Sequence, residues 1–73
     1  MTEEFGGFTI ETTKVSRRET KYTVRQGENV ICWLEQRGSR IEQRHIIPEY
    51  RDQFRDFLRQ WRTVNGNKFP FNY

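Results

Sequence analysis

The side chains best suited to bind an anion are four arginines near the C-terminal end of the chain, Arg51, Arg55, Arg59 and Arg62. In a helix of about 3.6 residues per turn, this spacing places them in one row. Like charges one turn apart repel each other weakly, and two aspartates within the segment offset part of that repulsion. Guanidinium groups bind phosphates and carboxylates, so the row predicts contacts to a nucleic acid or to an acidic protein surface. The alternative is an ordinary solvated face.

A second candidate site surrounds Trp33. Cations occupy outward positions of the strands expected around it, at Lys21, Arg25, Arg40 and Arg44. Single-stranded nucleic acid binds such surfaces because bases stack on the ring, for roughly 1–3 kcal/mol each, while the cations contact phosphates. The alternative for Trp33 is burial, in a homodimer or beneath the C-terminal tail.

Catalysis and metal binding find little support. His45 is the only histidine and Cys32 the only cysteine. They do not form a metal-ligand set, and no nucleophile with an orienting carboxylate accompanies His45. The glycines form no phosphate-binding loop. We therefore expect no enzyme, no metal and no cofactor.

The charge distribution also favours an anionic partner. The net charge is +3, and residues 1–15 carry −2 of it, so the remainder carries +5. Ten of the 13 basic residues are arginine, which suits phosphate and carboxylate recognition better than lysine does.

A chain of 73 residues builds only a small core, so we expect a homodimer to add buried surface. The single cysteine in an apolar run excludes an intrachain disulfide and favours a reducing compartment. The sequence has no long apolar run and no leader-like segment, which predicts a cytoplasmic protein without a membrane anchor.

Alternation of apolar and polar residues predicts four strands within residues 8–47, joined by turns at Gly27 and Gly38. Residues 1–7 are expected to be a mobile start with a Gly6-Gly7 hinge. Ile41 and Ile46 fall on opposite phases of the last strand, which indicates a bulge or register change near His45.

A helix is predicted over residues 48–64, opened by Pro48 and closed by Gly66. Its apolar stripe consists of Tyr50, Phe54, Phe57, Leu58, Trp61 and Val64. The aromatic tail, residues 65–73, is expected to complete the core; the alternative is that it reaches a partner or covers Trp33.

The expected fold is therefore a single α+β domain, a four-stranded antiparallel meander followed by one helix. The helix would cover an inner face made of Phe8, Ile10, Tyr22, Val24, Val30, Cys32, Leu34 and Ile41. The uncovered face would present Lys21, Thr23, Arg25, Ile31, Trp33, Arg40 and Arg44, with Glu11 and Glu42 as acidic exceptions.

Four segments together resemble a repeat of the Pur family, the purine-rich-element-binding proteins: 20–25, 29–35, 39–41 and 54–58. The resemblance implies four antiparallel strands and a helix, pairing of two repeats, and binding of single-stranded DNA or RNA on the sheet. The coactivator positive cofactor four is similar in architecture. One repeat length implies a homodimer here. The dense helix arginines and the aromatic tail depart from the Pur pattern.

Two functional hypotheses follow. The first is a homodimeric protein that binds single-stranded nucleic acid on the sheet around Trp33, with the helix arginines as auxiliary phosphate contacts. The second is a small interaction module or inhibitor that presents the helix arginines and the aromatic tail to an acidic protein, since arginine and aromatic residues dominate interface hot spots.

Overall fold

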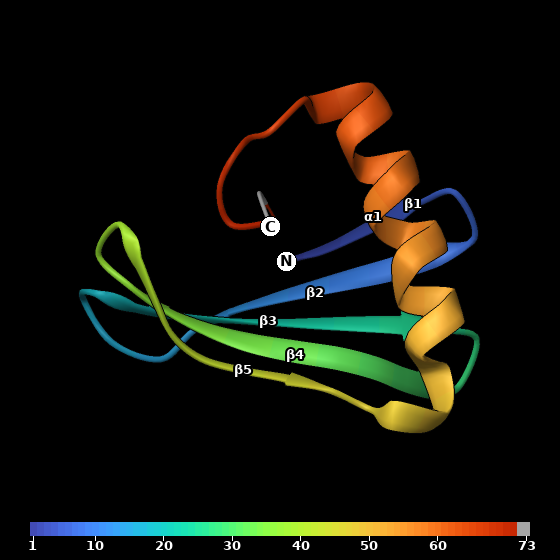
Figure 1. Ribbon diagram of the computed structural model, residues 1–73. Coiled ribbons are helices and arrows are strands. Elements are labelled where there is room, and N and C mark those ends of the chain that lie inside the picture. The colour runs from blue at the N-terminus through green and yellow to red at the C-terminus, as the bar shows by residue number, and fades with distance from the viewer. Residues whose placement is uncertain (72–73) are drawn as a thin grey trace.

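The computed structural model, which describes residues 1–71, is an α+β fold with one antiparallel sheet and one C-terminal helix (Figure 1). The sheet has five strands in the order β1-β2-β3-β4-β5, so each strand pairs with its neighbour in sequence. The strands are β1 (Thr2–Phe5), β2 (Phe8–Lys14), β3 (Glu19–Gln26), β4 (Asn29–Arg37) and β5 (Arg40–Ile46). The predicted meander and its turns at Gly27 and Gly38 are confirmed.

The prediction of four strands was wrong by one, because residues 2–5 form strand β1 where a mobile start was expected. Gly6 and Gly7 are the two-residue turn of the β1–β2 hairpin, with φ of 56° and 85°. A tight hairpin turn of this kind needs positive φ, which glycine adopts without steric cost. The strand is held from one side by Phe5, whose ring lies 6.3 Å from that of Phe57 and 5.7 Å from that of Trp61.

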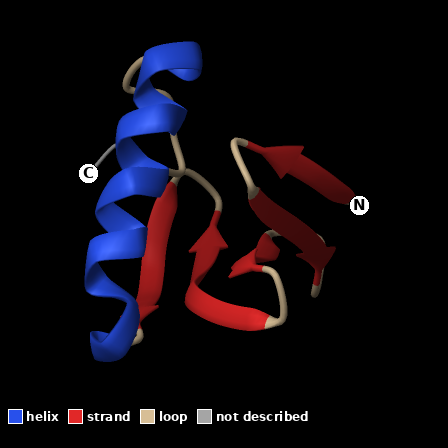
Figure 2. Ribbon diagram, turned by 90° about the vertical axis from the view of Figure 1, so that its right-hand side faces the viewer, coloured by secondary structure: helices blue, strands red, loops and turns tan. Residues whose placement is uncertain are grey.

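The helix begins as a 3-10 turn, η1 (Pro48–Tyr50), and continues as α1 (Arg51–Asn65). It lies against one face of the twisted sheet and leaves the other face uncovered (Figure 2). Gly66 ends it with φ of 66°, and its N–H donates to the carbonyl of Arg62 at 2.8 Å. The predicted helix over residues 48–64 is confirmed, with two differences: its first three residues form a 3-10 turn, and it ends one residue later, at Asn65.

The core lies between α1 and the sheet. Its buried members are Phe8, Ile10, Val24, Ile31, Cys32, Leu34, Phe54, Phe57 and Phe71. Phe57 is fully buried and stands edge-on to Phe8 at 5.5 Å and to Phe71 at 5.0 Å. The prediction that Val64 belongs to the core-facing stripe is wrong, because this residue keeps 71% of its surface exposed.

A bulge in β4 reverses the predicted facing of two residues. Val24 pairs with Cys32 and Arg25 with Val30, so Ile31 is an extra residue in β4. It was predicted on the uncovered face, but it is fully buried in the core, and its carbonyl accepts the N–H of Ile47 at 3.0 Å. Val30, predicted in the core, instead shares the uncovered face with Arg25. Bulges place an additional residue on one strand and thereby shift the alternation of all later positions.

The C-terminal tail completes the core, as predicted, through Phe71. Only 1% of its surface is exposed, and its ring lies 4.8 Å from that of Trp61 and 5.9 Å from that of Tyr22. These partners lie on the helix side of the sheet, so this part of the tail does not cover Trp33. The last part of the predicted tail, residues 72 and 73, lies outside the described residues. No helix in the described chain is long and apolar enough to cross a membrane.

Candidate nucleic-acid interface

The face of the sheet that α1 leaves uncovered, here called the outer face, carries an aromatic patch at Trp33. Opposed residues of antiparallel strands share a face, and Trp33 is opposed by Thr23 on β3 and by His45 on β5. The rings of Trp33 and His45 lie 5.7 Å apart and are tilted by 33°. The Lys21 ammonium lies 5.2 Å from the Trp33 ring centre, within the range of a cation–π contact. Trp33 is half-buried and His45 exposed.

A second bulge explains why His45, and not Arg44, belongs to this patch. Glu35 pairs with Gln43 and Gln36 with Ile41, which leaves Glu42 as an extra residue of β5. The predicted register change therefore exists, three residues before His45.

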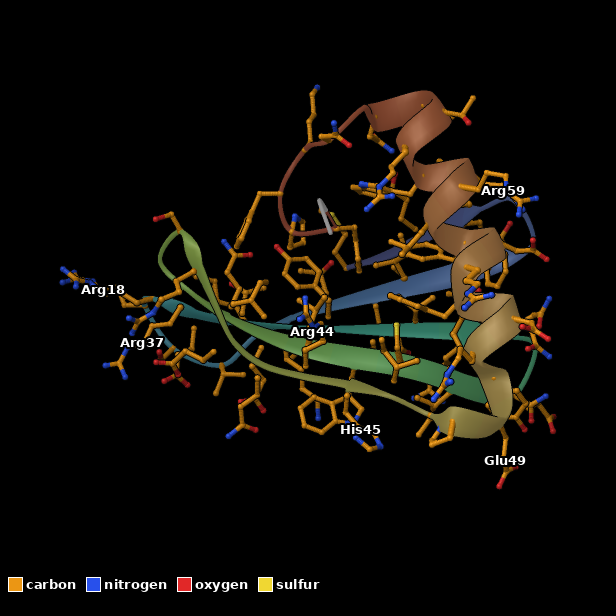
Figure 3. All side chains as sticks on the ribbon, viewed as in Figure 1. Arg18, Arg37, Arg44, His45, Glu49 and Arg59 are labelled. Carbon is orange, nitrogen blue, oxygen red and sulfur yellow. The ribbon has the colours of Figure 1, made fainter. Side chains whose placement is uncertain are left out.

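Arg44 was predicted on the outer face and lies instead on the helix side, opposite the buried Leu34. Figure 3 shows Arg44 and His45, adjacent in the sequence, on opposite sides of the sheet. Sequence reasoning missed His45 as a site residue. The signal that would have found it was the phase mismatch of Ile41 and Ile46. Counting back from Ile46 places Arg44 inward and His45 outward, whereas counting forward from Ile41 places them the other way round.

The remaining predicted cations of the outer face are engaged with carboxylates. Arg25 donates through its Nε to Glu11 at 3.0 Å, between adjacent strands β3 and β2. Both side chains are about 40% exposed, so the pair is worth little to stability, but the carboxylate offsets the attraction that Arg25 offers to a phosphate.

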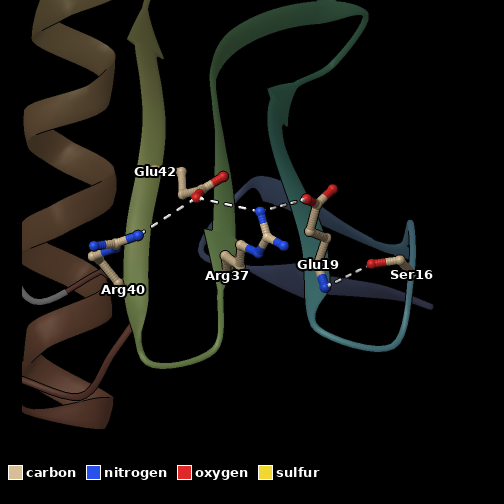
Figure 4. A network of polar contacts seen from close by, with 5 residues as sticks. All are labelled: Ser16, Glu19, Arg37, Arg40 and Glu42. Atoms are coloured by element: carbon tan, nitrogen blue, oxygen red, sulfur yellow. Dashed lines mark hydrogen bonds and ion pairs between the residues drawn. The ribbon is translucent and has the colours of Figure 1, made fainter.

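Arg40 belongs to a network at the far end of the sheet (Figure 4). Its guanidinium lies 3.7 Å from Glu42, and Arg37 lies 3.9 Å from the same carboxylate and 3.8 Å from Glu19. The backbone N–H of Glu19 donates to the hydroxyl of Ser16 at 3.2 Å. Glu42 thus holds two arginines on the outer face.

The outer face as a whole is close to neutral. Register and ion pairing place four cations there, Lys21, Arg25, Arg37 and Arg40. They also place five carboxylates there, Glu4, Glu11, Glu19, Glu35 and Glu42. The prediction of a basic sheet face with only two acidic exceptions is therefore wrong. What distinguishes this face is its aromatic patch and the lysine beside it.

Positive charge is concentrated on the helix. Arg51, Arg55 and Arg59 are exposed, and Arg62 is half-buried. Arg59 points away from the sheet and pairs with Asp56 at 3.6 Å, as the sequence spacing predicted (Figure 3). Neither Arg51 nor Arg55 makes an ion pair with any residue of the described chain. A shallow groove of about 590 Å³ is lined by Arg55, Arg59 and Arg62, with the half-buried Leu58 among its lining residues.

Cys32 is buried at 1% exposure, and burial raises the pKa of its thiol to about 12. The thiolate is the nucleophilic and metal-binding form, so this side chain stays protonated and inert near neutral pH. Burial likewise raises the pKa of Tyr22. Both groups belong to the core and contribute no charge to either candidate surface.

No protein-family model, curated protein or solved structure matches this chain. The resemblance to a Pur repeat therefore stays a prediction.

Proposed function

We propose that this protein binds single-stranded nucleic acid through the aromatic patch of its outer face. The observation that carries the proposal is the half-exposed Trp33, held between Lys21 and His45 on a sheet face that no helix covers. Bases stack on such rings whatever their sequence, and the ammonium beside the ring is placed to contact a phosphate.

The patch favours a single strand over a duplex. A flat sheet face presents its rings to bases only when the bases are unpaired, because paired bases expose their edges and not their faces. Residues around Trp33 include Thr23, Glu11 and Gln43, but no set of side chains forms a bidentate pattern toward one base. The proposal therefore includes weak sequence preference.

The test is a titration with oligothymidine, which does not fluoresce, in a Trp61→Phe variant so that Trp33 alone reports. We expect quenching of Trp33 at low salt that weakens as salt is added, since phosphate binding releases counterions. Trp33→Ala should weaken binding by about 5- to 150-fold, which corresponds to the loss of about 1–3 kcal/mol of stacking. For Trp33→Ala the affinity is read from the anisotropy of a dye-labelled oligothymidine. By the same readout Trp61→Phe should bind as the unaltered protein does, because Trp61 packs on Phe5 and Phe71 in the core.

A folded protein that shows no quenching at low salt would contradict the proposal. The interaction hypothesis would then be preferred, with the helix arginines facing an acidic protein. The aromatic tail no longer supports that hypothesis as a reaching element, because Phe71 is buried in the protein's own core.

We further propose that the protein is a homodimer. The exposed Val64 lies near the end of α1, beside a depression that Phe5 and Gly6 help to line. Pairing there would bury apolar surface and leave the outer face open to a ligand.

A further inference from the structure

We infer that a bound single strand leaves the aromatic patch at His45, crosses the open edge of β5 and places its phosphates against Arg44, Arg51 and Arg55 on the helix side. The inference rests on the proposed function. It assigns the stacking of bases and the neutralisation of phosphates to opposite sides of the sheet.

The first step is that the outer face lacks the net positive charge needed to bind the phosphate backbone of a nucleic acid. Its arginines face carboxylates at 3.0 to 3.9 Å, and the face carries more carboxylates than cations. Lys21 is the cation that the patch itself offers. Binding of a single strand normally combines stacking with a positively charged path, so that path has to lie elsewhere on the molecule.

The second step is that the patch ends at the edge of the sheet. His45 lies on β5, the last strand in the sheet order, and it pairs with Trp33 on the strand inside it. A nucleic-acid strand whose bases stack on both rings therefore reaches the edge of the sheet within one more nucleotide. Beyond β5 the described chain places no further strand.

The third step is that cations continue on the other side of this edge. Arg44 follows the alternation of β5 onto the helix side, and the chain passes from Ile46 through η1 directly into α1. The helix therefore starts beside β5, and Arg51 and Arg55 are the helix arginines closest to that start. Helix α1 carries four arginines against two aspartates, which complements a polyphosphate backbone.

The test compares short and long oligothymidines, of about 4 and about 16 nucleotides, which span the site sizes of single-strand-binding domains. The variant is Arg51→Gln with Arg55→Gln. The matched control is Arg17→Gln with Arg18→Gln, which removes the same charge from exposed residues of the β2–β3 loop. Arg18 lies at the end of the sheet far from the helix (Figure 3).

For the long oligomer, the helix variant should reduce the slope of log affinity against log salt by about 1.4, since each phosphate contact on a single strand contributes about 0.7. The slope for the short oligomer should not change, because the aromatic patch alone accommodates an oligomer of that length. The loop control should leave both slopes close to those of the unaltered protein. Equal effects of the helix and loop variants, or an unchanged slope for the long oligomer, would overturn the inference.

Failure of the inference differs from failure of the proposed function. If the unaltered protein binds both oligomers and loses both with Trp33→Ala, but the helix variant behaves as the control, only the path around β5 is wrong. If the unaltered protein binds neither oligomer, both proposals are wrong. If the helix variant abolishes binding of an acidic peptide such as oligoglutamate while oligothymidine does not bind at all, the helix arginines serve a protein partner.

Discussion

Replacement of Phe71 by alanine should remove a large part of the stability of this protein, although the residue is two positions from the last one in the chain. Phe71 is 1% exposed and contacts three aromatic rings, those of Tyr22, Phe57 and Trp61. It therefore closes the core over the part of the sheet that lies beside α1. A tail that contributed nothing would tolerate the substitution.

The expected magnitude follows from its burial. Truncating a buried phenylalanine to alanine costs about 3–5 kcal/mol through lost transfer free energy and the cavity left behind. Native domains are stabilised by roughly 0.05–0.15 kcal/mol per residue, or about 4–11 kcal/mol for a chain of this length. The substitution should consequently take away about a quarter or more of the free energy of unfolding, and most or all of it if the stability lies at the low end of this range.

The assay is urea unfolding followed by far-ultraviolet circular dichroism, with the free energy obtained by linear extrapolation. The control is Phe69→Ala in the same tail, because Phe69 keeps 36% of its surface exposed and should lose less than half as much. If Phe71→Ala costs no more than Phe69→Ala, the tail does not pack as described and the core assignment of Phe71 is wrong.

Two further predictions concern the core thiol and the dimer. Folding raises the pKa of Cys32 from 9.0 to about 12, so the unfolded state alone ionises between these values. The free energy of unfolding should therefore fall above pH 9 by up to about 1.4 kcal/mol per pH unit, and it should fall less in Cys32→Ala. Urea unfolding of both proteins at neutral pH and above pH 9 measures this, and an equal fall in the two proteins would contradict it. Val64→Asp should shift sedimentation toward the monomer without loss of fold, whereas Val15→Asp, at an exposed apolar residue of the β2–β3 loop, should not; unchanged sedimentation of Val64→Asp would remove this surface from the proposed dimer.

The sequence was sufficient to predict the meander, the helix and most of the core, because each depends on local signals. Period-two alternation identified four strands, and Pro48 and Gly66 identified the helix ends. Strand β1 was missed because it is short and mostly exposed, and only Phe5 reaches the core. The Gly6-Gly7 pair was the available signal, since two glycines between extended segments are typical of a hairpin turn.

The site was harder to predict because two bulges change which side chains share a face. Ile31 and Glu42 are each one residue more than the partner strand requires, and neither is marked by an unusual residue type. A prediction from alternation alone therefore assigned Val30 and Ile31 to each other's faces of the sheet, and did the same for Arg44 and His45. The balance of charge on the outer face depends on pairings between strands, such as Arg25 with Glu11, which residue spacing along one strand does not reveal.

The extra residue at Glu42 has a consequence for how this surface can vary among sequences. A bulge accommodates its extra residue without changing the pairing on either side of it, so a chain without Glu42 would still place Gln43 opposite Glu35 and Arg44 opposite Leu34. His45 would stay beside Trp33, and Arg44 would stay on the helix side. Two chains whose β4–β5 hairpins differ by this one residue would therefore present the same surface, and the gap in their alignment would mark the bulge.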